Sequence, residues 1–293
     1  MSIEIAIPYW GEPQLLFDAV ASVLHQTDPD WQLLVVDDCY PAPAVAVWFD
    51  EHPDPRIRYV RNESNVGIAG NFQRCLDLAV GDRVTFMGCD DLLKPEYVAL
   101  VRELAALEPA ADLIQVGVEV IDEEGEPFEP LSDRIKARLR RRHRGAKVLQ
   151  GEELAASLLL GNWFYWPSLS FRREALVGRR FRQDLPIILD LALILDVITD
   201  GGVVRVDDRV GFSYRRHRHS LSSTALMDGT RFADERRFFA ETSATMRGRQ
   251  WTRAARAARL HPTSRLYAAS LIPSAVRQGD PVAAGRLVRH IVA

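Results

Sequence analysis

Residues 84–95 read VTFMGCDDLLKP, in which two adjacent aspartates closely follow an apolar run. The run VTFM (84–87) is typical of a buried strand. A second acidic doublet, Asp37-Asp38, ends the continuous apolar run WQLLVVDD (31–38), which suits a strand buried on both faces of a parallel sheet. Ligands bind beyond the carboxyl ends of such strands, so we expect the four carboxylates to converge in one crevice.

The order of elements around these strands predicts the fold class. Apolar strands alternate with amphipathic helices over the first 121 residues, and this alternation is typical of βαβ units. The sequence therefore predicts an α/β fold with a mostly parallel sheet flanked by helices. The expected strands are 3–9, 31–38, 57–60, 84–87 and 112–121, and the expected helices are 13–24, 42–52, 68–80 and 95–107.

The pattern changes after residue 121. Residues 122–147 are first acidic and then strongly basic, so we interpret them as a surface excursion or a mobile loop. Beyond Ser220 the chain is expected to be helical, with breaks at prolines. Between these two parts the sequence predicts helices at 151–160 and 185–199, an aromatic stretch at 162–174, and strands at 203–206 and 209–217.

The net charge of −3 hides an asymmetry along the chain. From residue 229 to residue 293, 12 arginines accompany 4 acidic residues, a balance of +8, whereas the remainder carries −11. This basic end is a candidate for contact with anionic lipid headgroups or with a second copy of the chain, and a solvated helix fits equally well. No nucleic-acid recognition motif accompanies the charge, so we expect no nucleic-acid partner.

The sequence also limits where the protein is expected to work. No apolar run reaches the roughly 18–20 residues that span a bilayer, and no signal-peptide pattern opens the chain. The cysteines Cys39, Cys75 and Cys89 form no CxxC pair, so we interpret them as reduced thiols and expect no structural zinc. We therefore expect a cytoplasmic protein, with peripheral contact at a membrane as an option.

The acidic doublets have an ordinary interpretation and a functional one. Aspartate after a strand often caps a helix or forms a turn, and one doublet alone would not exclude this. Two doublets in one crevice would repel one another unless a cation or a proton lay among them. Oxygen ligands of this kind suit Mn²⁺ or Mg²⁺, which bridge to substrate phosphates. No GxGxxG motif follows the first strand and no GxxxxGK[ST] motif occurs, so the pattern favours a metal–diphosphate site.

Four stretches carry motifs in an order and spacing that match one family: IPYWGEP (7–13), SVLHQTDPDWQLLVVDD (22–38), NESNVGIAGNFQRCLDLA (62–79) and VTFMGCDDLLKPEYV (84–98). They resemble the family 2 inverting glycosyltransferases of the GT-A fold. The resemblance implies a Rossmann-like sheet and a divalent metal, Mn²⁺ or Mg²⁺. It also implies transfer of a sugar from a UDP- or dTDP-sugar to a hydroxyl acceptor, in polysaccharide or cell-envelope glycan synthesis.

The resemblance also divides the chain. It implies a GT-A glycosyltransferase domain over 1–222, with a nucleotide-binding half at about 1–121 and an acceptor half at about 148–222. Residues 223–293 would then be a basic helical C-terminal extension. The acceptor remains open among a glycan, a lipid-linked glycan and a small molecule.

Residues for the donor follow from the same resemblance. In such enzymes the loop after the first strand carries an aromatic near the base, and the second aspartate of VVDD contacts that base. The DxD-like element places one carboxylate near the ribose and one on the metal. The sequence departs from the commonest Asp-x-Asp-Asp pattern at Gly88, and Gly70 stands where an arginine is frequent. The implied nucleotide-binding residues are Pro8, Tyr9, Trp10, Asp38, Asn71 and Asp90, and the implied metal ligand is Asp91.

The resemblance places the catalytic base at Asp190, where Leu189 replaces the glutamate of the usual Glu-Asp pair. An inverting transfer needs a base to deprotonate the attacking hydroxyl. The apolar neighbours of Asp190 would raise its pKa, which suits such a base. A buried or capping helix carboxylate is the ordinary alternative, and Asp184 and Asp196 are the fallback candidates for the base.

The stretch FSYRRHRHSLSS (212–223) resembles a segment that folds over the donor in related enzymes. Cations there would meet the diphosphate, and a histidine would complete the metal shell. A solvated strand edge is the ordinary alternative. The residues implied are His217 as a metal ligand and Arg215, Arg216 and His219 as contacts of the diphosphate.

Two other functions remain open on sequence alone. A sugar-phosphate nucleotidyltransferase uses a similar sheet and acidic site, but it normally has a glycine-rich, basic phosphate loop that IPYWGEP lacks. A catalytically inactive nucleotide-sugar binding protein would keep Asp38 and lose the base. The aromatic run Trp163–Trp166 is more typical of a core than of a sugar-stacking platform.

Overall fold

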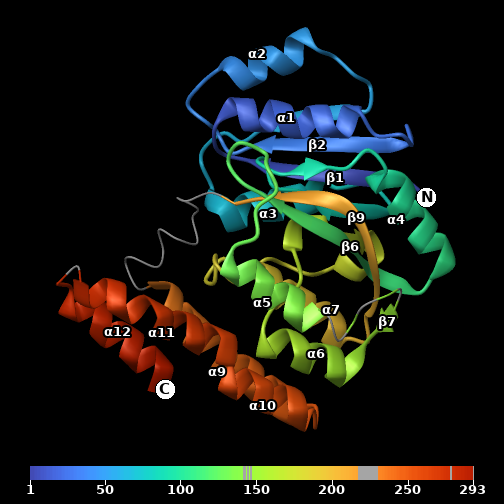
Figure 1. The fold of residues 1–293 in the computed structure, drawn as a ribbon. Coiled ribbons are helices and arrows are strands. Elements are labelled where there is room, and N and C mark those ends of the chain that lie inside the picture. The colour runs from blue at the N-terminus through green and yellow to red at the C-terminus, as the bar shows by residue number, and fades with distance from the viewer. Residues whose placement is uncertain (141–142, 144, 146, 217–229, 278, 293) are drawn as a thin grey trace.

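The computed structural model describes residues 1–140, 143, 145, 147–216, 230–277 and 279–292. Its centre is a nine-stranded sheet with helices on both faces (Figure 1). The strand order is β3-β2-β1-β4-β8-β6-β9-β5, and β7 pairs with β9 outside this path. The strands are β1 (Ile3–Tyr9), β2 (Trp31–Asp37), β3 (Ile57–Arg61), β4 (Arg83–Phe86), β5 (Leu92–Leu93), β6 (Ala111–Ile121), β7 (Lys147–Leu149), β8 (Leu169–Arg172) and β9 (Val203–Arg215).

The sheet has a parallel half and a mixed half. Strand β1 lies parallel between β2 and β4, and β2 pairs in parallel with β3. Strand β8 then runs antiparallel to both β4 and β6, whereas β6 and β9 are parallel partners. The expected α/β sheet flanked by helices is confirmed, and the antiparallel β8 marks the border between its halves.

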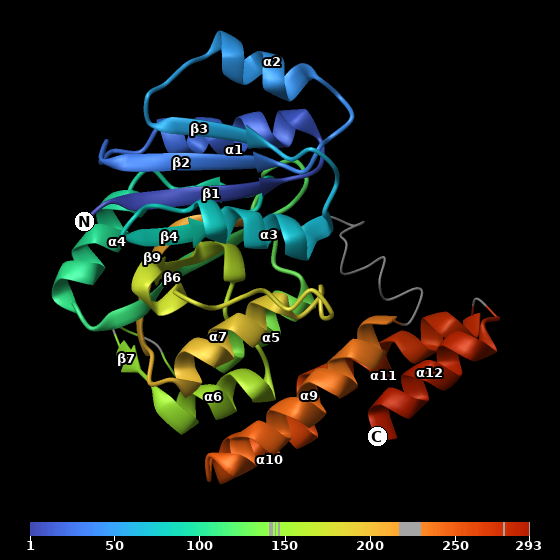
Figure 2. The ribbon, with the colours of Figure 1, turned by 180° about the vertical axis from the view of Figure 1, so that it is seen from behind.

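Helices cover both faces of the sheet (Figure 2). Helices α1 and α4 share one apolar core with the strands, and α3, α6 and α7 share the other. The helices are α1 (Pro13–Leu24), α2 (Ala44–Glu51), α3 (Gly67–Leu78), α4 (Tyr97–Leu107), α5 (Leu131–Arg140), α6 (Gly151–Leu160), α7 (Leu189–Thr199), α9 (Thr230–Gly248), α10 (Thr252–Leu260), α11 (Pro262–Arg277) and α12 (Pro281–Val292).

Successive side chains of β1 and β2 pack alternately into the two apolar cores. Ile5 and Ile7 are fully buried on the side of α1 and α4, whereas Ala6 between them belongs to the core on the side of α3. Leu34 and Val35 divide in the same way on β2. Both faces of these strands are buried, which is why the apolar run of β2 is continuous in sequence.

The aromatic stretch after α6 is part of the core. Trp166 stacks on Phe86 of β4 with ring centroids 5.6 Å apart, and Phe72, Phe171 and Phe181 surround this pair. All four aromatic side chains of the run Trp163–Trp166 are buried. The core interpretation of this stretch is therefore confirmed.

The segment 122–147 is more ordered than its composition indicates. It contains α5 and β7, and β7 pairs antiparallel with β9, so the interpretation as a mere surface excursion is wrong for these parts. Helix α5 is held to the domain through Asp133, which is only 5% exposed. Its carboxylate accepts hydrogen bonds from the hydroxyl of Tyr165 at 2.8 Å and from the guanidinium of Arg216 at 2.9 Å.

Helices α7 and α11 depart from the pattern expected from sequence. Helix α7 begins at Leu189 and not at residue 185, because Leu185–Ile188 form a turn in which the Ile188 N–H donates to the Leu185 carbonyl. Pro262 and Pro281 begin α11 and α12, as expected for a residue that fits the first helical position. Pro273, in contrast, lies inside α11 and does not end it.

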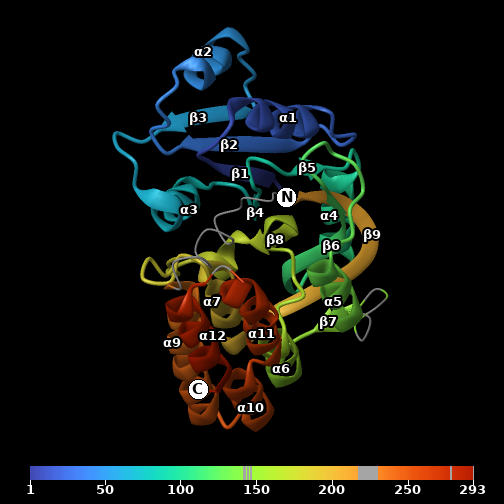
Figure 3. The same cartoon turned by 60° about the vertical axis from the view of Figure 1, so that its left-hand side comes forward.

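Helices α9–α12 form a lobe beside α6 and α7 (Figure 3). Phe238 and Phe239 of α9 and the alanines of α10 join the same core as α6 and α7. Helices α11 and α12 pack on each other over a smaller core that includes Phe232 and Leu287. The predicted boundary at residue 222 lies outside the described residues, so the division into two units stays a prediction. None of the described helices combines the length and the apolar character needed to cross a membrane.

We predict that Phe86→Ala destabilises the protein by about 3–5 kcal/mol, because it leaves a cavity among packed aromatic rings. Phe86 is fully buried. The matched control is Phe128→Ala, since Phe128 is 45% exposed and its loss should change the free energy of unfolding by less than about 0.5 kcal/mol. Chemical denaturation of both variants measures the difference, and equal effects would contradict this description of the core.

Candidate active site

The turn after β4 brings two carboxylates together at Gly88. A Cβ atom placed on Gly88 would lie 2.6 Å from Oδ2 of Asp91 and 2.7 Å from Oδ1 of Asp90. Any larger residue would displace both carboxylates, because such contacts are too short for real side chains. In this arrangement an aspartate at position 88, as in the Asp-x-Asp-Asp pattern, would require Asp90 and Asp91 to move.

Asp91 is the buried member of this pair, with 1% of its surface exposed. Its Oδ1 accepts a hydrogen bond from the backbone N–H of Arg215 at 2.9 Å. Burial raises the pKa of Asp91 well above its ordinary value, and the charge of Asp90 raises this pKa further. A cation beside the two carboxylates would offset both effects.

The Arg215 side chain fixes this turn to the neighbouring strands. Its Nε donates to the carbonyl of Asp90 at 2.8 Å, and its Nη1 donates to the carbonyls of Asp122 and Glu123 at 3.1 and 3.0 Å. These bonds tie the end of β9 to the Asp90 turn and to the end of β6. The guanidinium therefore has a structural part in the site, and its predicted contact with a diphosphate stays a prediction.

The other acidic doublet does not join this pair. Asp37 is fully buried and pairs with Arg61, whose Nη1 lies 2.7 Å from Oδ2 of Asp37. The hydroxyl of Tyr59 donates to the same oxygen, and the N–H of Tyr40 donates to the other at 2.7 Å. Among the described residues no group of three or more acidic, histidine or cysteine side chains is arranged to hold a metal. The expected convergence of four carboxylates is therefore wrong, because within the fold Asp37 forms an ion pair with Arg61 and accepts hydrogen bonds from Tyr59 and Tyr40.

Asp38 and Asn71 support the loop that leads into α3. Asp38 accepts hydrogen bonds from the N–H groups of Val66 at 2.8 Å and Gly67 at 2.9 Å, and from the side-chain amide of Asn62 at 2.9 Å. Asn71 accepts from the same amide at 3.1 Å and donates to the carbonyl of Val36. The two residues therefore lie in one network at the carboxyl edge of the sheet, and Asn62 is a member that the sequence interpretation missed.

Trp10 is the exposed aromatic at this edge. Pro8 and Tyr9 belong to β1, and Tyr9 is fully buried with its hydroxyl donating to the carbonyl of Gly11 at 2.8 Å. Trp10 is 49% exposed, and its ring meets the ring of Tyr40 edge-on at 5.3 Å. Of the two predicted aromatics, only Trp10 can present a ring face to a nucleotide base. Tyr40 was not singled out by sequence, although only Cys39 separates it from the VVDD element.

Asp190 lies in the first turn of α7, among apolar neighbours, and is partly buried. Burial raises its pKa, whereas the charges of Lys136 and Arg231 oppose this rise. The side-chain amide of Asn162 lies 3.5 Å from Oδ2 of Asp190, at the limit of a hydrogen bond. A carboxylate in this setting has the properties that a general base requires.

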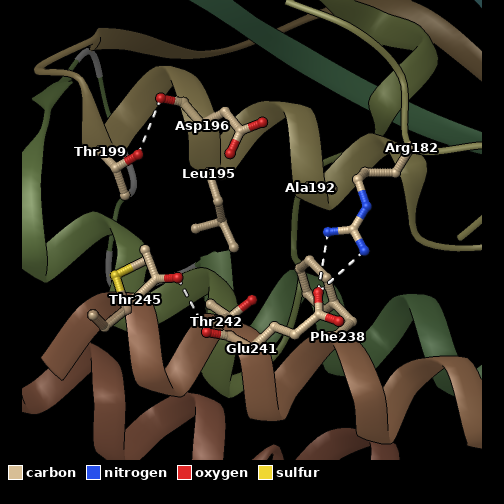
Figure 4. A pocket seen from close by; sticks show the side chains of 10 residues that line it. Arg182, Ala192, Leu195, Asp196, Thr199, Phe238, Glu241, Thr242 and Thr245 are labelled. Carbon is tan, nitrogen blue, oxygen red and sulfur yellow. Dashed lines mark hydrogen bonds and ion pairs between the residues drawn. The ribbon is translucent and has the colours of Figure 1, made fainter. Parts of the chain in front are cut away.

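The two fallback carboxylates lie in other surroundings. Asp184 is exposed and pairs with Arg182 and Arg237, and its bonds to Arg182 lower its pKa to about 2. Asp196 lies further along α7, where it lines a cavity of about 130 Å³ between α7 and α9 (Figure 4). The first is a weak base and the second faces the C-terminal lobe, so the geometry favours Asp190.

Helix α5 adds polar groups that sequence reasoning did not assign to the site. Arg216 donates to Asp133 of this helix through Nε and Nη2, and its guanidinium lies 5.0 Å over the ring of Tyr214. Lys136 of α5 lies near Asp190, since each acts on the pKa of the other. Asp133 and Lys136 are three residues apart, so helical periodicity could have identified this common face. The predicted site residues His217 and His219 lie outside the described residues.

The sequence model of glycosyl transferase family 2 matches residues 4–176, which is more than half of the chain. WcaA of Escherichia coli (strain K12), named as a candidate colanic acid biosynthesis glycosyl transferase, is 31% identical over 99 residues, covering 33% of this chain and 36% of WcaA. The succinoglycan biosynthesis protein ExoO of Rhizobium meliloti is 24% identical over 231 residues, 77% of this chain and 64% of ExoO. The uncharacterized protein y4gI of Sinorhizobium fredii is 29% identical over 126 residues, 42% of this chain and 14% of y4gI. The chain thus spans less than two thirds of each of these relatives.

Solved structures share the fold. The crystal structure of S. aureus TarS 1-349 superposes with a TM-score of 0.67 at 14% identity, covering 99% of this chain and 81% of that TarS fragment. The complex of the same fragment with UDP-GlcNAc gives a TM-score of 0.64 at 15% identity, covering 83% of this chain and 66% of that one. These similarities confirm the expected GT-A fold, and the match of the family model over more than half of the sequence shows that the chain belongs to glycosyl transferase family 2.

Proposed function

We propose that this protein transfers a sugar from a nucleoside diphosphate sugar to a hydroxyl acceptor, with inversion at the anomeric carbon. The observation that carries this proposal is that the acidic side chains lie at two separate places, as a metal site and a catalytic base require. Asp90 and Asp91 form a close pair at the end of β4, whereas Asp190 stands apart in the first turn of α7. The family match supports a transferase and does not favour a nucleotidyltransferase or an inactive binding protein.

The donor is proposed to bind along the carboxyl edge of β1, β2 and β4. The ring of Trp10 would contact the base, and Asp38 and Asn71 would shape the pocket through the α3 loop. Asp90 would lie near the ribose. The complex of the similar TarS fragment with UDP-GlcNAc supports a uracil nucleotide, and UDP- and dTDP-sugars are the donors proposed for this protein.

A divalent metal fits the Asp90–Asp91 pair. The donor set is all oxygen, as Mn²⁺ and Mg²⁺ prefer, and the mutual repulsion of the two carboxylates is of the kind that a cation offsets. When bound, the ion supplies positive charge to the leaving diphosphate. Asp91 is proposed as its ligand, with His217 as a further one and Arg215, Arg216 and His219 near the diphosphate.

Asp190 is proposed to act as the base in a single displacement. The acceptor hydroxyl gives its proton to the Asp190 carboxylate, and its oxygen forms the bond to the anomeric carbon. The bond from that carbon to the diphosphate oxygen breaks in the same step, and the nucleoside diphosphate leaves. Inversion follows because attack and departure occur on opposite faces of the sugar.

The acceptor is proposed to belong to polysaccharide or cell-envelope glycan synthesis, as the names of WcaA and ExoO indicate for those proteins. A lipid-linked acceptor would explain the positive balance of the C-terminal helices, which could then contact anionic headgroups on the cytoplasmic side of a membrane. Contact with a second copy of the chain is the other proposed use of these helices.

We predict that Asp91→Asn abolishes metal-dependent nucleotide binding and leaves the fold as stable or more stable, because it removes one of two facing carboxylates. Calorimetric titrations with UDP, dTDP and GDP, first with Mn²⁺ and then with EDTA, measure the binding. The wild type should bind a uracil or thymine nucleotide at least about tenfold more tightly with Mn²⁺, a difference of about 1.4 kcal/mol. Asp50→Asn, a change at an exposed position of α2, should behave as the wild type. Equal binding in EDTA and in Asp91→Asn would contradict the metal–diphosphate site.

We predict that Asp190→Asn lowers kcat by about 10²–10⁴-fold, the usual contribution of a general base. The control is Asp196→Asn on the same helix, which should change kcat less than about threefold. Release of nucleoside diphosphate from UDP- and dTDP-sugars in the presence of a panel of hydroxyl acceptors measures the rate, and UDP affinity should stay unchanged in both variants. Loss of activity in Asp196→Asn, with activity kept in Asp190→Asn, would move the base to Asp196.

The wild-type rate should also depend on pH through Asp190. A base must be ionised, and the pKa of Asp190 is raised above its ordinary value of 3.8. We therefore expect kcat/KM to fall as the pH is lowered through this raised pKa, and to be constant above it until another group titrates. The residual activity of Asp190→Asn should lack this acid limb; an unchanged acid limb in the variant would assign it to another group.

A further inference from the structure

Lys136 of α5 connects the segment 122–147 to the surroundings of Asp190. Its Nζ donates to the carbonyl of Phe164 at 3.1 Å and lies 4.4 Å from the centre of the Tyr165 ring. The proposed donor and base residues do not include this lysine. Its contacts are nevertheless all with the acceptor half, because α5 packs there through Asp133 and Tyr165.

A run of hydrogen bonds leads from Lys136 to Asp190. The ammonium group of Lys136 donates a hydrogen bond to the carbonyl of Phe164. The N–H of Phe164 in turn donates to Oδ1 of Asn162 at 3.2 Å. The other end of the same amide, Nδ2 of Asn162, lies 3.5 Å from Oδ2 of Asp190. The ammonium group of Lys136 is thus linked to the carboxylate through residues 162–164, and its charge also acts on Asp190 directly.

The charges around the two groups come from three helices and from the residue that follows β9. Asp190 of α7 is influenced by Lys136 of α5 and Arg231 of α9, both of which favour its ionised form. Lys136 is influenced by Arg216, which follows β9, and by Asp133 and Asp190. Burial and the repulsion by Arg216 lower the pKa of Lys136 to about 8, against the attraction of the two carboxylates.

We propose that Lys136 is a positioning residue for the transfer, whose ammonium group keeps the Asp190 carboxylate ionised and oriented, so that α5 forms one wall of the acceptor site. This inference rests on the proposed function in one respect, since it takes Asp190 as the base. It adds a role for a segment outside the donor-binding motifs. It also gives the enzyme a second titrating group, because the lysine loses its charge in the alkaline range.

Titration of the Asp190 carboxyl group tests the coupling without any need for activity. Carboxyl ¹³C signals of aspartate can be followed by NMR, and the Asp190 signal is identified by its absence in Asp190→Asn. In Lys136→Met its midpoint should rise by about one pH unit, a tenfold change in proton affinity, whereas Lys136→Arg should leave the midpoint near the wild-type value. The Asp196 signal should move in neither variant. An Asp190 midpoint that is the same in Lys136→Met and wild type would overturn the inference.

The pH dependence of transfer provides the second test. The wild type should lose activity above about pH 8, because the uncharged lysine no longer orients the Asp190 carboxylate, and Lys136→Arg should keep activity to higher pH because arginine stays charged. Lys136→Met should lower kcat about tenfold or more, with an acid limb moved to higher pH and unchanged UDP affinity. Lys147→Met, a change on the exposed β7, is the matched control. A loss of thermal stability in Lys136→Met without any change in the pH profile would assign the lysine a purely structural role and overturn the proposal.

Failure of the proposed function is distinguishable from failure of this inference. A kcat in Asp190→Asn close to that of the wild type would overturn Asp190 as the base, whatever Lys136 does. Turnover that requires Asp190 but has the same pH profile in the wild type, Lys136→Met and Lys136→Arg would overturn only the role of Lys136.

Discussion

The close approach of the Asp90 and Asp91 carboxylates at Gly88 is the constraint on which the rest of the site depends. Two such groups, one of them buried, are unfavourable unless something holds them there. Here the turn is held by Arg215, whose backbone donates to Asp91 and whose side chain donates to the carbonyl of Asp90. Strand β9 carries Arg215 and pairs in parallel with β6. A strand of the mixed half of the sheet therefore keeps the Asp90–Asp91 turn, at the end of β4 in the parallel half, in its position.

The two halves of the domain divide the proposed chemistry between them. The carboxyl edge of β1, β2 and β4 presents Trp10, the Asp38 network and the acidic pair, all of which suit a nucleotide donor. The proposed acceptor half presents Asp190 on α7, with α5 packed beside it. Tyr214 lies at the junction, since its pKa responds to Asp90 and Asp91 on one side and to Asp133 on the other. Helix α5 thus contacts Arg216, the residue after β9, and also lies near Asp190, the proposed base.

Much of the parallel half could be predicted from sequence, because its strands are continuous apolar runs and its helices have regular apolar faces. The doublet at Asp90 could be found since it directly follows such a strand. The burial of Asp37 against Arg61 could not, because that pairing crosses between strands and a doublet looks the same whether or not it is neutralised. The docking of α5 was missed for a similar reason, as the basic composition around Lys136 indicates a solvated surface. The ion pair between the buried Asp133 and the half-buried Arg216 reverses that expectation.

An anomalous difference map of crystals grown with UDP and Mn²⁺ would locate the metal ion and the nucleotide together. We expect a manganese peak within coordinating distance of the Asp91 carboxylate, with the diphosphate on the same ion and the uracil ring next to Trp10. Nucleotide bound at this edge without a manganese peak near Asp90 or Asp91, or a peak coordinated by other residues, would contradict it.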